Sequence, residues 1–290
     1  MVHNQAAQTA FGPMVLAAVE QCEAPQRRLV NDDLAFAFLP AGLRAVVSAT
    51  RLGPLRRLMI GATERAGPGL WANLACRKRF IDEKLGDALP DIDAVIILGA
   101  GMDTRPYRLA RRSDVPVYEV DLPVNIERKK AAVRRVLGQA PPSVRLVPVD
   151  FERDDLAAEL TKAGHRRGDR TFFVWEGVTQ YLTADAVHAT FEYLRSAAPS
   201  SRLVFTYVRR DFIDGTNLYG ARSAHRRFRE KQQLWKFGMD TDGIAAYVAQ
   251  YGWRLIEQAG PDYFLRHYVQ PAGRNLTASH LEWTAYAEKI

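Results

Sequence analysis

The sequence predicts an α/β protein built around a mostly parallel sheet, and three observations support this class. Short apolar runs, of which residues 95–98 are the clearest, recur through the middle of the chain, as expected for strands buried on both faces. Stretches with helical periodicity separate these runs. The first four runs each end in glycine or a carboxylate, which is typical of open sheets that bind ligands at the carboxyl ends of their strands.

The chain begins with a region that we expect to be mainly helical. Phe11, Val15, Leu16 and Val19 recur at helical spacing, and the break at residues 67–69 precedes a further predicted helix over residues 72–85. We therefore expect a helical cap over residues 1–90 and a core over residues 91–290. The cap is expected to cover the carboxyl edge of the sheet.

The core follows as a series of predicted strands. The first ends in the turn Gly99-Ala100-Gly101. After the fifth, polar, aromatic and Gly-rich sequence interrupts the pattern and suggests a mobile lid at about residues 209–250. The predicted strands are residues 95–98, 117–121, 144–150, 171–177, 203–208, 253–257 and 281–287.

Asp103 indicates the kind of ligand that the first turn binds. A dinucleotide fold has a small residue and a helix N-terminus there to receive a pyrophosphate, which a carboxylate would repel. S-adenosylmethionine (SAM) has a sulfonium, an ammonium and no phosphate, so the turn favours SAM over NAD. Asp121, about twenty residues beyond the glycines, stands where an acid can accept the ribose hydroxyls.

Composition limits the possible partners and compartments. The 290 residues are 47% hydrophobic with a net charge of +7, but the basic residues are spread along the chain and accompany no nucleic-acid-binding motif. The apolar runs are too short for a membrane span, and no signal-peptide pattern opens the chain. Cys22 and Cys76 have no metal-type spacing. These observations predict a cytoplasmic protein that binds neither nucleic acid, membrane nor metal.

Three motifs resemble those of the leucine carboxyl methyltransferase family of class I SAM-dependent methyltransferases, in particular its bacterial branch with polyketide O-methyltransferases. The motifs are Leu98-Gly-Ala-Gly-Met-Asp-Thr-Arg105, Glu119-Val-Asp-Leu-Pro123 and Trp175-Glu-Gly-Val-Thr-Gln-Tyr-Leu182. The resemblance implies a Rossmann-like sheet of seven strands, the last one antiparallel, with the helical cap and the lid insertion.

The resemblance also implies SAM as cofactor and assigns its contacts. Arg77 resembles the arginine that binds the methionine carboxylate, with Arg79 as a second candidate. Asp121 resembles the ribose acceptor, Asp150 the acceptor for the adenine amino group, and Glu176 the acid that faces the cofactor's ammonium. The implied cofactor-binding residues are Arg77, Arg79, Gly99, Ala100, Gly101, Asp103, Arg105, Asp121, Leu122, Asp150, Phe151, Glu176 and Gly177.

The expected reaction is O-methylation of a small natural-product-like substrate, acidic or phenolic. A carboxylate is ionised at neutral pH and needs no general base, whereas a phenol, with a pKa near ten, would benefit from one. None of the six histidines lies in a recognisable catalytic motif, which favours a carboxylate. Tyr181 and Arg209 are the candidate substrate contacts, and Thr179 and Gln180 are further candidates for the pocket wall.

Other functions stay open at this stage. The same chemistry on a protein C-terminal carboxylate is one alternative. A nicotinamide-dependent oxidoreductase is another, which Asp103 and the absence of a third glycine disfavour. A third is a binding protein that kept the cofactor fold without turnover.

Overall fold

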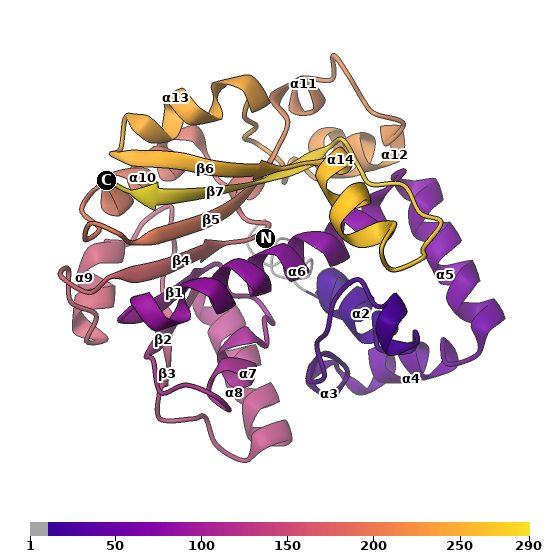
Figure 1. Cartoon of the computed structure of the whole chain (residues 1–290), viewed down its shortest axis with the longest axis horizontal. Coiled ribbons are helices and arrows are strands. Elements are labelled where there is room, and N and C mark those ends of the chain that lie inside the picture. Colours follow the sequence, from indigo (N-terminus) through magenta and orange to yellow (C-terminus); the bar gives the residue numbers. More distant parts are fainter. Residues whose placement is uncertain (1–10) are drawn as a thin grey trace.

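The structure, a computed structural model, describes residues 11–290, which form a seven-stranded sheet flanked by helices (Figure 1). The strand order is β3-β2-β1-β4-β5-β7-β6. Strands β1 to β5 pair in parallel, and β7 runs antiparallel to β5 and β6. The predicted seven-stranded α/β class with an antiparallel last strand is confirmed. The strands are β1 (Ala94–Leu98), β2 (Val117–Asp121), β3 (Val144–Pro148), β4 (Thr171–Trp175), β5 (Arg202–Val208), β6 (Trp253–Ala259) and β7 (Glu282–Lys289).

Strand β1 shows why only the strand ends are available to a ligand. Val95 and Ile97 pack on one face of the sheet, and Ile96 and Leu98 on the other, because successive side chains of a strand point to opposite faces. Each of these residues is at most 2% exposed. The first face is covered by α7 (Arg105–Leu109) and α8 (Pro123–Leu137), and the second by α9 (Leu156–Lys162), α10 (Ala184–Arg195) and α13 (Ile244–Ala249).

Helices occupy the described chain before β1, and α6 connects them to the sheet. It begins directly after Gly67-Pro68-Gly69 and is longer than the predicted helix over residues 72–85. The Trp71 indole on α6 donates to Glu20 Oε1 at 2.7 Å, and the Arg274 guanidinium donates to Glu20 Oε2 at 3.1 Å, so a buried carboxylate joins three segments. The helices are α2 (Phe11–Glu20), α3 (Ala35–Phe38), α4 (Ala41–Ala49), α5 (Gly53–Ala66) and α6 (Leu70–Ala88). The first ten residues of the predicted cap lie outside the described residues.

The chain between β5 and β6 returns over the sheet edge in short helices. They are α11 (Arg210–Ile213), α12 (Arg222–Ala224), a π-helical stretch (His225–Lys231) and α13. Phe212, Leu234, Trp235 and Leu281 pack together there in a small apolar cluster of their own. This cluster fixes the segment next to the end of β5. After β6, α14 (Pro261–Phe264) packs on α6.

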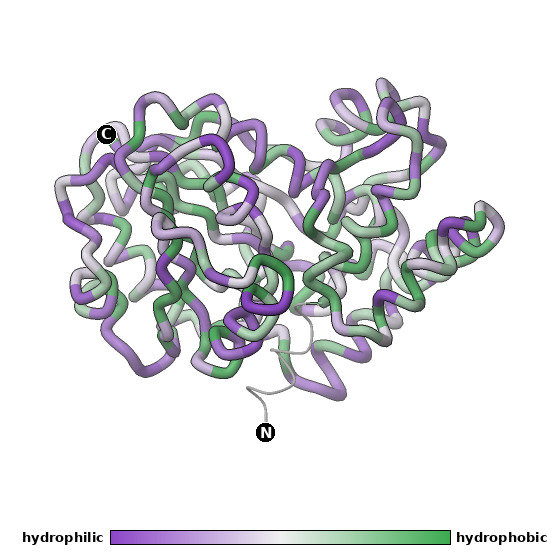
Figure 2. Tube along the Cα trace, turned by 90° about the horizontal axis from the view of Figure 1, so that it is seen from below, coloured by the Kyte–Doolittle hydropathy of each residue, from purple (hydrophilic) through white to green (hydrophobic). Residues whose placement is uncertain are grey.

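Hydrophobic and hydrophilic segments of the chain are distributed differently. Figure 2 shows hydrophobic segments passing through the interior while hydrophilic stretches lie mainly at the periphery. Within residues 11–290, no helix has the length and apolarity that a membrane crossing requires. Cys22 and Cys76 are both free thiols.

Candidate active site

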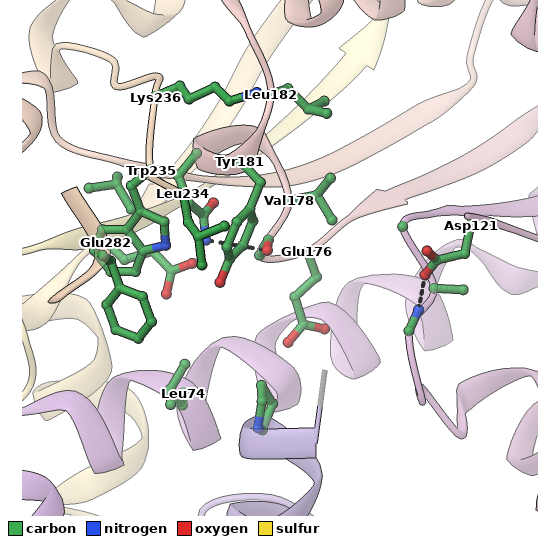
Figure 3. A pocket seen from close by; sticks show the side chains of 18 of the residues that line it. Leu74, Asp121, Glu176, Val178, Tyr181, Leu182, Leu234, Trp235, Lys236 and Glu282 are labelled. Atoms are coloured by element: carbon green, nitrogen blue, oxygen red, sulfur yellow. Dashed lines mark hydrogen bonds between the residues drawn. The ribbon is translucent and has the colours of Figure 1, made fainter. Parts of the chain in front are cut away.

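A cavity of about 770 Å³ lies at the carboxyl ends of the parallel strands. Figure 3 shows Asp121 and Trp235 at opposite ends of it, with Glu176 between them. We call the end formed by the strand termini the polar half; its lining includes Arg77, Lys78, Gly99, Gly101, Asp103, Asp121, Asp150, Glu176 and Glu282. We call the other end the apolar half; its lining includes Leu70, Leu74, Gln180, Tyr181, Val208, Ala221, Ala224, Phe228, Gln232, Leu234, Trp235 and Leu281.

The turn after β1 requires glycine. Gly99 has a φ of +71°, and a Cβ built on it would lie 2.3 Å from Cγ2 of Val178. The backbone N–H groups of Gly99 and Ala100 both donate to the carbonyl of Val120, at 2.8 and 3.0 Å. Bare backbone of residues 99–101 therefore lines the cavity at the end of β1, as predicted for the cofactor's amino-acid portion.

Asp121 ends β2 and holds this turn in place. Its carboxylate accepts from the backbone N–H of Gly101, from the N–H of Leu122 at 2.7 Å, and from Nδ2 of Asn125 at 2.8 Å. Burial raises the pKa of this carboxyl, and these three donors oppose the rise. Asp121 thus lines the cavity as an oriented hydrogen-bond acceptor, next to Leu122.

Glu176, after β4, is the centre of a buried ionic network. Its Oε1 lies 3.0 Å from Nε of Arg77 and 3.6 Å from Nζ of Lys78, and its Oε2 lies 2.7 Å from Nη1 of Arg105. Burial opposes its ionisation, but the charges of Lys78, Arg105 and Arg77 outweigh burial and hold the pKa of Glu176 well below its usual range. The carboxylate is therefore ionised and fixed.

Asp103 belongs to the same network. Its carboxylate accepts from the backbone N–H of Arg105 at 2.9 Å and pairs with the Arg105 guanidinium. Burial raises the pKa of Asp103, but the positive charges of Arg105 and Lys78 lower it by more than burial raises it. The pKa of this carboxyl is therefore below its usual value. The carboxylate that the sequence predicts as a repellent for phosphate is thus charged and lines the cavity.

Glu282 is a site residue that our sequence reasoning missed. It accepts from Nη1 of Arg77 at 2.7 Å and from the Thr206 hydroxyl at 3.0 Å, and its side chain is 6% exposed. Glu282 is the first residue of β7 and pairs with Val208, the last residue of β5. Because β7 is antiparallel, its start lies at the edge where the parallel strands end, and an acid at the start of the last predicted strand was the available signal.

The two residues that the resemblance assigns to adenine lie where strand β3 ends. Asp150 and Phe151 both line the cavity, and Asp150 Oδ1 accepts from the backbone N–H of Glu152 at 3.1 Å.

Gly177, which follows β4, also lines the cavity and has a φ of +70°. A Cβ on Gly177 would lie 3.1 Å from the Arg77 guanidinium, so glycine leaves room for that side chain.

Two of the predicted cofactor residues do not line the cavity. Arg79 pairs with Glu83 at 2.8 Å and lies over the ring of Tyr268, because it projects from a different face of α6 than Arg77. Arg105 is 3% exposed and lies behind the cavity wall, where it pairs with Asp82, Asp103 and Glu176. Arg105 therefore supports the carboxylates rather than facing a ligand.

The two candidate substrate contacts have different positions. Tyr181 lines the apolar half, beside Gln180, and its ring is directed into the cavity (Figure 3). Arg209 does not line it. Its guanidinium donates to Asp211 at 3.0 Å and lies over the ring of Tyr219, because an acid two residues away pairs with it locally. Thr179 is also turned away, and donates its hydroxyl to the carbonyl of Thr206.

The chain segment of residues 221–236 closes the apolar half. The backbone N–H of Lys236 donates to the carbonyl of Gln180 at 2.6 Å, and the Lys236 ammonium lies 3.5 Å from Glu152. Phe228 stacks on Trp235 with ring centroids 4.8 Å apart. The sequence contained no periodic pattern that predicted these lining residues.

Histidine and a metal-binding cluster are both absent from the described lining. No histidine of residues 11–290 is among the residues that line the cavity. His225 is buried beside Glu230, and His267 stacks on Tyr263. The same described part of the chain contains no group of three or more His, Cys, Asp or Glu side chains suited to a metal ion.

Comparison with known proteins finds similarity over most of the chain. The leucine carboxyl methyltransferase family pattern matches residues 10–195. A protein of Mycolicibacterium smegmatis, provisionally named an S-adenosyl-L-methionine-dependent methyltransferase, is 31% identical over 71% of this chain and 70% of its own length. A protein of Mycolicibacterium paratuberculosis with the same provisional name is 34% identical over 62% of this chain and 58% of its own length. The aligned region thus spans between about three fifths and two thirds of several of these relatives.

Two solved structures share the fold. One is a provisionally named methyltransferase from Thermobifida fusca, with a TM-score of 0.55 and 17% identity over 81% of this chain and 88% of that chain. The other is a DUF574 family protein from Streptomyces avermitilis, with a TM-score of 0.55 and 15% identity over 82% of this chain and 91% of that chain.

Proposed function

This chain belongs to the leucine carboxyl methyltransferase family and is a SAM-dependent methyltransferase, and from that premise we propose that it methylates a carboxylate or hydroxyl oxygen of a small, natural-product-like molecule. The observation that carries the proposal is the single cavity that joins the polar half, at the strand ends, to the apolar half under residues 221–236. Such a cavity suits a polar cofactor and a mostly apolar acceptor placed end to end.

The polar half fits SAM in charge and in hydrogen-bonding groups. Asp121 lines it as a carboxylate acceptor for ribose hydroxyls, and the Gly99–Gly101 backbone leaves room for the amino-acid portion. The carboxylates Asp103, Glu176 and Glu282 suit an ammonium and a sulfonium, while Arg77 offers a cation to the cofactor's carboxylate. The negative charges of the same three acids would repel the pyrophosphate of a dinucleotide such as NADH.

The chain contributes alignment and exclusion of water to the reaction. When bound, SAM would supply an electrophilic methyl carbon, and in-line attack by the acceptor oxygen would form a C–O bond as the C–S bond breaks and S-adenosylhomocysteine leaves. Glu176 and Arg77, fixed by mutual ion pairing, hold one side of the cavity rigid. Tyr181 lies beside Gln180 in the apolar half and can orient the acceptor oxygen through its phenol. The apolar side chains around it remove water from the nucleophile.

A carboxylate acceptor is favoured over a phenol. A phenol must lose a proton, and the acids Glu176 and Glu282 are both already paired with Arg77. No histidine among the described residues lines the cavity to serve as base. A carboxylate needs no such group because it is ionised at neutral pH.

The cofactor assignment is tested by titration calorimetry with SAM, its demethylated product S-adenosylhomocysteine, and NADH. The wild type is expected to bind the first two and not NADH. Asp121→Ala is expected to weaken both by about a hundredfold, because it removes two hydrogen bonds to a charged acceptor. Asp240→Ala, an exposed acid paired with Arg210, is the matched control and should bind like the wild type. Binding of NADH alone, or of none of the three, would contradict the proposal.

The reaction itself is tested with SAM that carries a labelled methyl group and a panel of aromatic acids and phenols. Methyl esters release labelled methanol in mild alkali, whereas methyl ethers do not. Alkali-labile product is the expected result, and alkali-stable product would assign hydroxyl methylation instead. Transfer only to a peptide C-terminus would replace the small-molecule substrate with a protein.

A further inference from the structure

Helix α5 leaves large apolar side chains in contact with solvent. None of its 14 residues is buried, and the helix lies at the edge of the molecule (Figure 1). Leu52, at its N-cap, is 64% exposed, and Leu58 is 61% exposed. Leu55 and Val46 are also exposed, so four of the seven large apolar residues that the described chain exposes fall between residues 46 and 58. Such a concentration in one short segment marks an interaction surface.

The exposed leucines lie along one side of α5, together with a basic residue. Leu52, Leu55 and Leu58 follow one another at three-residue spacing, which keeps them on neighbouring positions of one side of the helix. Arg65 follows Leu58 by seven residues, or about two turns, and therefore lies on the same side. Leucine and arginine on one exposed helix are typical of segments that lie on a lipid surface.

The segment of residues 41–66 has an excess of positive charge. It contains five arginines and a single acid, Glu64. The Glu64 carboxylate accepts from the backbone N–H groups of Gly69 at 2.8 Å and of Trp71 at 3.2 Å, so it is directed to the start of the next helix. The acid is thus engaged with backbone and compensates none of these arginines directly.

Three arginines of the segment have no ionic partner. Arg51, Arg57 and Arg65 are exposed and form neither an ion pair nor a side-chain hydrogen bond with any of residues 11–290. Arg56, in contrast, pairs with Glu23 at 2.8 Å. We call the exposed leucines and the three unpaired arginines the α5 face; it consists of Arg51, Leu52, Leu55, Arg57, Leu58 and Arg65.

The charge of the α5 face favours an anionic partner. A second copy that docked through the same face would bring the two sets of arginines together, and like charges repel. A nucleic acid would pair with the arginines but offer the leucines no apolar contact. An anionic lipid surface suits both groups, because leucine side chains enter the boundary of the acyl chains while arginines reach the charged headgroups.

We propose that the α5 face binds the surface of a membrane that contains anionic lipid. The short apolar runs of the sequence led us to expect no membrane partner, since none is long enough for a span. A helix that lies on the surface does not need that length, because only its exposed side chains enter the lipid.

The α5 face adjoins the cavity at one end. Helix α5 ends at Ala66, and the next residue, Gly67, lines the cavity. The Ser223 hydroxyl donates to the carbonyl of Ala66 at 2.7 Å, which connects the end of α5 to the segment that closes the apolar half. An apolar acceptor dissolved in the lipid would therefore have a short path to this half, a step that rests on the proposed function.

The test measures co-sedimentation of the full chain with vesicles of two compositions. One is phosphatidylcholine alone, and the other is phosphatidylcholine and phosphatidylglycerol in equal parts. We expect the wild type to bind the anionic vesicles about a hundredfold more tightly, since each of three arginines near such a surface contributes about fivefold. Added salt should weaken this binding. No binding to the anionic vesicles, or equal binding to both, would overturn the inference.

A first double variant tests the leucines. Leu55→Ser with Leu58→Ser should weaken binding to the anionic vesicles by about tenfold or more, because it removes the apolar contacts with the lipid. Both positions are exposed, so the fold should be retained. Ile256→Ser is the matched control, because Ile256 is an equally exposed apolar residue on β6, outside the α5 face. Wild-type binding by the double variant, or the same loss in the control, would refute the assignment to these leucines.

A second double variant tests the charge. Arg57→Gln with Arg65→Gln should weaken binding to the anionic vesicles by about twenty-five-fold and leave binding to the neutral vesicles unchanged. Arg112→Gln with Arg134→Gln removes two exposed arginines elsewhere and should bind nearly as the wild type does. An equal loss in both double variants would mean that the net charge of the protein, and not the α5 face, causes the attraction.

Two further measurements separate this inference from its alternatives. Sedimentation equilibrium without lipid should show no dimer that Leu55→Ser with Leu58→Ser dissociates; such a dimer would assign the face to a second copy and overturn the inference. Vesicle binding is measured without cofactor, and S-adenosylhomocysteine binding is measured in the same samples. Loss of vesicle binding with retained S-adenosylhomocysteine binding refutes only the lipid contact. Absence of S-adenosylhomocysteine binding in the wild type contradicts only the proposed function.

Discussion

The two halves of the cavity are built in different ways. The polar half is formed by strand ends, and its charged groups are paired with one another, as Glu176 is with Arg77 and Arg105. The apolar half is formed by side chains from α6 and from residues 221–236, and its polar atoms at Gln180, Gln232 and Trp235 are unpaired. The ion pairs of Glu176 in the polar half are thus made within the protein, whereas these three atoms of the apolar half have no partner in the protein.

This difference separates the tasks of the two halves. A site whose charges are paired and buried has one rigid geometry, which suits a cofactor that is the same in every turnover. A site whose wall includes many side chains of one connecting segment, residues 221–236, can change there with little effect on the sheet. We therefore expect substitutions in the polar half to affect stability and cofactor binding together, and those in the apolar half to affect the substrate alone.

The largest effect is expected for Arg77→Met. This change leaves Glu282 buried without a cation, because its other partners are the neutral Thr206 and Asn73. Removing one partner of a buried ion pair costs about 3–5 kcal/mol, so the free energy of unfolding should fall by that amount. Denaturant unfolding measures it. Arg77→Lys is the control and should lose less, and a loss below about 1 kcal/mol for Arg77→Met would show that the network is not structural.

The next effect concerns the turn after β1. Gly99→Ala introduces a Cβ that meets Val178 at 2.3 Å on a backbone with a φ of +71°, and should cost about 1–3 kcal/mol of stability and about tenfold in SAM affinity. The double variant with Val178→Ala relieves the clash but not the backbone conformation. It should recover part of the loss, and full recovery would mean that the backbone conformation contributes nothing. Calorimetry and unfolding of both variants measure these effects.

A third test uses pH. The pKa of Glu176 is lower in the folded protein than its usual value of 4.5. As the pH falls through that value, the unfolded state therefore binds more protons than the folded state. The stabilising effect of this carboxylate is thus present above that value and is lost below it, by at most about 1.4 kcal/mol per pH unit for one proton. Glu176→Gln should flatten the fall in the free energy of unfolding between about pH 5 and pH 3. Gln180→Met, in the apolar half, should keep the wild-type slope, and an unchanged slope in Glu176→Gln would refute the linkage.

The smallest effect is expected for Lys236→Met at the rim of the apolar half. Lys236 lies 3.5 Å from Glu152, whose carboxylate also accepts from the N–H and hydroxyl of Thr183. A partly exposed ion pair is worth about 0–1 kcal/mol, so thermal unfolding and SAM affinity should stay close to those of the wild type. A clear loss of SAM affinity would mean that the two halves are coupled through this segment.

Residues at the ends of parallel strands were accessible from the sequence. Gly99, Asp121, Asp150 and Glu176 each follow an apolar run, and parallel strands bring their carboxyl ends to one edge of the sheet. Local pattern and topology together then place them around one cavity. The seven-stranded sheet with an antiparallel last strand, which the family resemblance implies, is also confirmed.

Residues whose position depends on docking were not accessible. Arg77 and Arg79 are two positions apart on α6, and only the packing of that helix decides that Arg77 meets Glu282. Arg79 instead pairs with Glu83, four residues further along the same helix. Arg209 follows β5, yet its pairing with Asp211 keeps it out of the cavity.

The sequence by itself determined the α/β class, the strand-end carboxylates and the glycine turn, because these depend on periodicity and on residues adjacent in the chain. Only the tertiary structure decided the partner of Arg77, the closure of the apolar half and the three unpaired polar atoms in it. Those features arise where segments far apart in the sequence meet. Their energy comes from burial and charge pairing between such segments, which no local pattern records.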